Sequence, residues 1–105
     1  MKNRDPIQAL MKALSNYLLK HGRRILSITS ILGQDKVRIS IESLYWYHNI
    51  STGYRYLEDA IKDILSDKAK IATLNDKGIN IVKIKGNFYI EVPRQLIKRL
   101  ARNGK

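Results

Sequence analysis

The chain has 105 residues, a length that fits one domain and is too short for two ordinary hydrophobic cores. Apolar residues make up 44% and charged residues 28%, which excludes intrinsic disorder of the whole chain. No cysteine is present, so disulfides, thiolate metal sites and cysteine nucleophiles are excluded. With 20 Lys and Arg against nine Asp and Glu, the formal charge is +11, which indicates an anionic partner and most commonly a nucleic acid.

A membrane surface is the second anionic partner that such a charge suggests. No apolar run in the sequence approaches the roughly 18–20 residues that a membrane span needs. The N-terminus is an amphipathic, charged stretch and not a signal peptide. We therefore expect a cytoplasmic, nucleoid-associated protein without membrane contact. The many Ile, Tyr and Lys residues also suit a heat-adapted source, although an AT-rich genome would favour them too.

The first predicted element is an amphipathic helix over residues 5–21. Asp5 and Pro6 have the residue types of an N-cap and a first helical position, and apolar residues follow at three- and four-residue steps. Gly22 is expected to end this helix. A second helix is predicted over residues 23–32, although its isoleucines would also suit a strand.

The middle of the chain predicts a brief strand, a short helix and a longer helix. Residues 37–39 form the strand, and Ser40 caps a short helix that ends near Asn49. After a tight connection, Ser51 or Thr52 begins the longer helix. Its predicted core stripe comprises Tyr54, Leu57, Ala60, Ile61, Ile64 and Leu65. Its predicted solvated row comprises Asp59, Asp63 and Asp67.

The end of the longer helix is open to two interpretations. Aspartates at a helix C-terminus would oppose the helix dipole. Ser66 could therefore cap a further helix that reaches Asn75 and is closed by Gly78. Alternatively, residues 69–74 form a strand.

A β-hairpin is predicted in the C-terminal third. Residues 79–85 and 88–92 flank Gly86-Asn87, and a glycine in the first central position predicts a type II′ turn. That turn would place Lys85 opposite Phe88.

A basic helix follows Pro93, with residues such as Arg94 and Lys98 on its charged face. The sequence thus predicts an α+β fold of the winged helix-turn-helix type, mostly helical with a C-terminal hairpin wing and a terminal helix. We expect a single domain over residues 1–105. Its expected parts are N-terminal helices over 5–33, a winged-helix core over 37–92 and the basic helix over 93–105.

The side chains that catalysis or metal binding requires are missing. His21 lies on the apolar stripe near the predicted helix end, and no carboxylate is spaced to orient His48. The sequence has neither a phosphate-cradling glycine loop nor a nucleophile elbow. We therefore expect no enzymatic activity, no catalytic residues, no cofactor and no metal site.

The winged helix-turn-helix layout predicts where DNA would bind. The helix that begins at Thr52 would enter the major groove by its N-terminal end, with the Ser51 and Thr52 hydroxyls on phosphate. Arg55 and Tyr56 would project from its first turn toward bases or backbone.

The hairpin would serve as the wing, with Lys83, Lys85 and Asn87 on the flanking backbone, although such lysines also keep exposed strand edges soluble. Arg23 and Arg24 are further candidate DNA-binding residues, although they would equally complement the dipole of the first helix.

Five aromatic residues lie near this region. We expect Tyr45 and Tyr54 to join the core, and Trp46 or Tyr47 to make a packing or dimer contact and not a base-stacking platform.

Residues 51–61, S-T-G-Y-R-Y-L-E-D-A-I, followed by the lysine-rich hairpin over 78–92, resemble small archaeal winged-helix DNA-binding proteins of crenarchaea and their viruses and plasmids. The resemblance covers about residues 37–92. It implies a transcription regulator, a chromatin protein or a partition protein, often dimeric. It places Thr52, Arg55 and Tyr56 at the start of the recognition helix and residues 83–87 in the wing.

One departure from the family pattern opens a second register. The usual Leu-x-x-Lys-Gly-Ile ending occurs at residues 74–79, about a dozen positions later than expected. In the second register residues 67–77 form the recognition helix. Lys68, Lys70, Thr73 and Lys77 would then make the contacts.

Together these observations predict a double-stranded DNA-binding protein, either a transcription regulator or an architectural protein. We expect a homodimer through the first helix or the terminal helices. One alternative is an RNA- or ribosome-associated winged helix. Others are a protein-interaction module that docks through its row of aspartates and, least favoured, a small nuclease.

Overall fold

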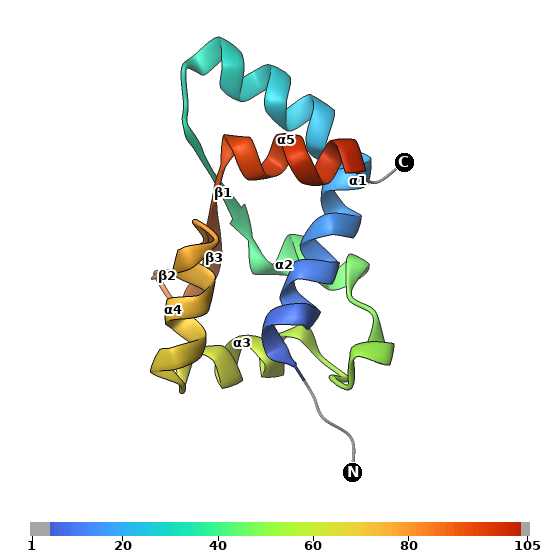
Figure 1. Ribbon diagram of the computed structural model, residues 1–105, viewed down its shortest axis with the longest axis vertical. Helices are drawn as coiled ribbons and strands as arrows, with labels where there is room; N and C mark the ends of the chain where they lie inside the picture. The colour runs from blue at the N-terminus through green and yellow to red at the C-terminus, as the bar shows by residue number, and fades with distance from the viewer. Residues whose placement is uncertain (1–4, 104–105) are drawn as a thin grey trace.

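The computed structural model describes residues 5–103, and the ends of the predicted 1–105 domain lie outside that range. The described residues form an α+β fold with five α-helices, two short 3-10 helices and three strands (Figure 1). In chain order these are α1 Pro6–Leu32, β1 Lys36–Ser40, α2 Ile41–Leu44, η1 Tyr45–Tyr47, η2 Ile50–Thr52, α3 Leu57–Leu65, α4 Lys68–Asp76, β2 Asn80–Ile84, β3 Asn87–Pro93 and α5 Arg94–Asn103. The predicted α+β class is confirmed. Among the described residues, no helix combines the length and the apolar composition needed to cross a bilayer.

Helix α1 runs through most of the length of the molecule. The Asp5 carboxylate accepts the backbone N–H groups of Ile7 and Gln8, both at 3.1 Å, which confirms the predicted N-cap. Gly33, with φ 69°, closes the helix in the left-handed conformation. At 1.5 Å per residue, 27 residues span roughly 40 Å, close to the 46 Å longest dimension of the molecule.

The predicted helix end at Gly22 is wrong, because α1 continues through this residue without a break. Gly22 is buried where α5 approaches α1, and a Cβ placed on it would lie 2.8 Å from the Cβ of Ala101. The glycine therefore serves the close contact between two helices and not a turn. His21, expected near a helix end, consequently lies in the middle of α1.

The core forms between the first half of α1, helix α3 and the sheet. The residues that α1 and α3 bury there are Ala9, Leu10, Ala13, Leu14, Leu18, Leu57, Ala60, Ile61 and Ile64. Of the six core residues predicted for the longer helix, five are buried, and the exception, Leu65, is exposed. Tyr45, also expected in the core, is exposed, whereas Tyr54 is buried as expected.

The sheet is antiparallel, with strand order β1-β3-β2. Ile39, Ile90 and Ile81 face one another across the three strands and join the core from each of them. On the opposite side of the sheet, Arg38 and Glu91 form a cross-strand ion pair at 2.7 Å. Pro93 ends β3 as predicted, and α5 follows directly.

Helix α3 begins at Leu57, five or six residues later than predicted. Residues 50–52 form η2, in which the Thr52 hydroxyl donates to the Asn49 carbonyl at 2.8 Å, and Gly53, with φ 93°, ends this turn. Tyr54 then enters the core from an extended segment, where its hydroxyl donates to the Asp63 carboxylate at 2.6 Å. The prediction failed because Tyr54 lies three residues before Leu57 and so mimics helical spacing.

The hairpin turn is Lys85-Gly86 and not Gly86-Asn87. Both central residues have positive φ, 51° and 85°, as in a type I′ turn. Lys83 therefore pairs with Phe88, a two-residue shift from the predicted register. A shift of two keeps every side chain on its expected face, so alternation alone could not distinguish the registers.

Helix α5 is tied to the second half of α1 by Arg94, which was expected to supply charge on the surface of this helix. Its Nε donates to the Thr29 hydroxyl at 2.9 Å and its Nη2 to the Leu26 carbonyl at 3.1 Å. The guanidinium therefore fixes the crossing of the two helices together with the Gly22–Ala101 contact.

The substitution Gly22→Ala tests this helix contact. Alanine favours a helix by about 1 kcal/mol over glycine, yet the added methyl group would overlap Ala101. We expect Gly22→Ala to lower the free energy of unfolding by about 1–3 kcal/mol in urea denaturation. In an Ala101→Gly background the same substitution should cost much less, whereas an equal gain in both backgrounds would contradict the close contact.

Candidate nucleic-acid interface

Basic charge in the second half of the chain lies in two regions: α4 with the hairpin, and α5, whose residues 94–103 carry four basic residues and no acidic one. Residues 67–87 carry five lysines and two aspartates, a net charge of +3. Helix α3 carries Glu58, Asp59 and Asp63 against Lys62, a net charge of −2. An anionic polymer would therefore be attracted to α4 and the hairpin, as well as to α5, and repelled by the outer side of α3.

Helix α4 forms after a two-residue link from α3. Asp67 caps it through a 2.9 Å bond from the Ala69 N–H, so the predicted further helix is confirmed with Asp67 in place of Ser66, and the strand alternative is wrong. At its other end, the Ile79 N–H donates to the Leu74 carbonyl at 3.0 Å, and Gly78 adopts φ 86°. This closure turns the chain sharply from α4 into β2.

The Asp67 carboxylate also binds Lys70, whose Nζ lies 2.8 Å from Oδ2. The hydrogen bond from Lys70 lowers the pKa of Asp67, and the Ala69 N–H lowers it further. The same hydrogen bond raises the pKa of Lys70. The Asp67 carboxylate therefore holds Lys70 at the start of α4. An external anion would have to compete with this carboxylate for the Lys70 ammonium.

The outward face of α4 is open to solvent. Of its nine residues, Leu74 is the buried one, and Lys68, Ala69, Ala72 and Thr73 are exposed. The Thr73 hydroxyl donates to the Ala69 carbonyl at 2.9 Å, which keeps this side chain close to the helix. Small and retracted side chains let another molecule approach the backbone of α4 closely.

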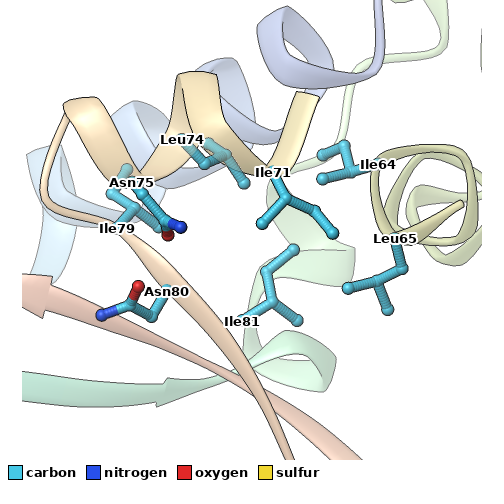
Figure 2. A pocket seen from close by; sticks show the side chains of 8 residues that line it. All are labelled: Ile64, Leu65, Ile71, Leu74, Asn75, Ile79, Asn80 and Ile81. Atoms are coloured by element: carbon cyan, nitrogen blue, oxygen red, sulfur yellow. The ribbon is translucent and has the colours of Figure 1, made fainter. Parts of the chain in front are cut away.

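The inner face of α4 rests on α3 and β2 over an apolar cavity of about 240 Å³ (Figure 2). The cavity is lined by Ile64, Leu65, Ile71, Leu74, Asn75, Ile79, Asn80 and Ile81. Figure 2 shows the isoleucine and leucine side chains of all three elements directed into this space. The large apolar side chains of α4, Ile71 and Leu74, are thus turned inward, and its outer side is exposed to solvent.

The hairpin tip carries three of the predicted DNA-binding residues. Lys83, Lys85 and Asn87 are all exposed. The Lys83 ammonium lies 5.4 Å from the centre of the Phe88 ring, which holds it at the end of the strand. Lys85 occupies the turn itself. The structure thus brings these three residues together at one end of the β2–β3 hairpin.

The residues predicted to begin the first recognition helix lie on η2 and on the segment before α3. Ser51 and Thr52 belong to η2 and do not begin a helix, while Arg55 and Tyr56 are exposed in the segment that precedes α3. Tyr56 is the N-cap residue of α3 but makes no side-chain capping bond. This segment therefore offers exposed side chains without the expected helix N-terminus behind Ser51 and Thr52.

Arg23 and Arg24 are exposed in the middle of α1, so they do not complement a helix C-terminus as considered from the sequence. Arg24 Nη2 lies 3.2 Å from Nδ1 of His21. The opposite ring nitrogen of His21, Nε2, lies 2.9 Å from the Tyr47 hydroxyl. Arg24 is therefore partly engaged within α1.

The second histidine, His48, has a structural role. Its Nε2 lies 2.7 Å from the Tyr54 carbonyl, to which it donates. This bond supports the extended segment from which Tyr54 enters the core. Within residues 5–103, no group of three or more His, Cys, Asp or Glu side chains is arranged to hold a metal ion.

Comparison of the chain with protein-family models finds no match, and comparisons with curated proteins and with solved structures find none either. The resemblance to archaeal winged-helix proteins therefore stays a prediction from the sequence.

The cap of α4 makes a prediction about pH. Because folding lowers the pKa of Asp67 below its ordinary 3.8, its carboxylate stabilises the folded chain above about pH 4. That contribution is lost as the pH falls through the lower pKa of the folded state. Asp67→Asn should therefore flatten the loss of thermal stability below pH 4, measured by circular dichroism. Asp59→Asn, on an exposed position of α3, serves as the control, and an equal effect of both variants would contradict this role of Asp67.

Proposed function

We propose that this protein binds double-stranded DNA as a winged helix-turn-helix protein, in a regulatory or architectural role. Helix α4 is the element that enters the major groove, and the tip of the β2–β3 hairpin rests on the adjacent backbone. This proposal adopts the second register considered from the sequence, with Lys68, Lys70, Thr73 and Lys77 on the recognition helix.

The order of elements supports this assignment. A helix and a strand, α1 and β1, are followed by α3 and α4, and the hairpin of β2 and β3 follows α4 immediately. The strand order β1-β3-β2 holds the hairpin to the rest of the fold. Because the closure at Gly78 leads directly into β2, α4 and the hairpin are neighbours in sequence and in space.

The observation that carries the proposal is the contrast between α3 and α4. Helix α3 buries four of its nine residues and exposes acidic side chains, as a supporting helix would. Helix α4 buries one residue of nine and exposes lysines at both ends, Lys68 and Lys77. Phosphate contacts from such lysines supply affinity, and the small residues between them permit close approach to the groove.

Duplex binding by paired variants tests the proposal, with fluorescence anisotropy measured across a salt series. We expect Lys68→Ala with Lys77→Ala to reduce the slope of log affinity against log salt by about 2. Lys83→Ala with Lys85→Asn should reduce this slope by the same amount. Asparagine is chosen at position 85 because it tolerates the left-handed conformation of that residue.

A matched pair removes the same charge elsewhere, since Lys12 and Lys98 are exposed on α1 and α5. Lys12→Ala with Lys98→Ala should leave the slope nearly unchanged. If Arg55→Ala with Tyr56→Ala lowers the affinity for duplex DNA more than the α4 pair does, residues 52–56 and not α4 make the main contact. Tighter binding to structured RNA than to duplex DNA, or no duplex binding at about 50–100 mM salt, would overturn the proposal.

A further inference from the structure

A stripe of mainly apolar residues runs along α1 beyond the part of the fold that covers it. Seven residues follow the alternating four- and three-residue spacing of a coiled-coil seam: Leu10, Leu14, Tyr17, His21, Arg24, Ile28 and Ile31. Leu10 and Leu14 are fully buried in the core. Tyr17 and His21 are half-buried, and the ring of Tyr47 in η1 packs against both of them.

The last part of this stripe lies open to solvent. Helix α5 contacts the second half of α1 at Gly22 and Thr29, which lie on a different side of the helix. Figure 1 shows the end of α1 extending past α5 at the top of the view. Ile28 is 50%, Ile31 83% and Leu32 63% exposed, and they lie at positions i, i+3 and i+4 of one helix face.

The same segment carries no charge. Residues 25–34, I-L-S-I-T-S-I-L-G-Q, contain no acidic or basic side chain, in a chain whose formal charge is +11. Two copies of so basic a protein repel each other, so an uncharged surface is where they meet with the least electrostatic repulsion. Exposed isoleucines on an uncharged helix end satisfy that requirement.

We propose that residues 25–34 form an isologous dimer interface, in which the ends of two α1 helices pack antiparallel. A two-fold axis between Thr29 and Ser30 sets Ile28 against the partner's Ile31. In this register Arg24 lies opposite the end of the partner's α1, because that helix ends at Leu32 and the chain turns at Gly33. The contact between the two helices therefore contains no cationic side chain, which is what two copies of so basic a chain require.

The contact is small, since it involves about two helical turns of each chain, and a small interface gives a weak dimer. The dimer does not depend on nucleic acid, so it is measured on the DNA-free full-length chain. Sedimentation equilibrium over about 1–500 μM covers the relevant range. Ile31→Glu places a charge in the centre of the interface, and we expect at least about a 30-fold weaker dimer.

The chain supplies a matched control in Ile50, which is 71% exposed on η2. Ile50→Glu should leave the dimer intact. A wild-type chain that stays monomeric throughout the concentration range would overturn the proposal. A dimer broken by Ile50→Glu and not by Ile31→Glu would also overturn it, because the interface would then lie near Trp46 and Ile50.

Disulfide linkage tests the antiparallel register. The chain has no cysteine, so Ile28→Cys and Ile31→Cys can be introduced singly. Mild oxidation should link a mixture of the two variants faster than either variant alone, whereas faster linkage within each single variant would indicate parallel packing and contradict the proposed register.

Discussion

The burial of the first half of α1 is the constraint on which the arrangement of the molecule depends. Ala9, Leu10, Ala13, Leu14 and Leu18 are completely buried, and α3 packs against this face with its own apolar stripe. The apolar face of α3 is covered by α1. Helix α4 therefore packs beside α3 and against β2, over the cavity between them. That placement leaves the outer face of α4 in solvent, next to the hairpin. The exposure of α4 beside the hairpin is therefore a consequence of how α1 and α3 bury each other.

Helix ends and strands with strong local chemistry were predictable from the sequence. Asp5-Pro6 and Gly33 mark the ends of α1, and Ser40 caps α2 as expected. Pro93 separates β3 from α5. The Leu-x-x-Lys-Gly-Ile motif at residues 74–79 left open a helix over residues 67–77, and α4 spans Lys68–Asp76. In each case a single residue type satisfies a backbone group or forbids a conformation, so no tertiary information was needed.

The failures lie where tertiary contacts decide between equivalent local patterns. Gly22 has the features of a helix end until Ala101 of α5 is known to lie against it. Tyr54 fits the α3 stripe, but its bond to Asp63 and the His48 bond to its carbonyl fix an extended segment. The hairpin registers differ by two residues and bury the same faces. Arg94 resembled surface charge, yet it binds α1 some 65 residues earlier in the chain.

The central claim is that α4 and the hairpin tip form one DNA-contact surface. A titration of isotope-labelled protein with a short duplex, followed by amide chemical shifts in NMR spectra, tests it most directly. The account predicts that the largest shifts fall on residues 68–77 and 83–87, with little change in α3 and in residues 25–34. Largest shifts at residues 51–56, or at Arg23 and Arg24 in the middle of α1, would contradict it.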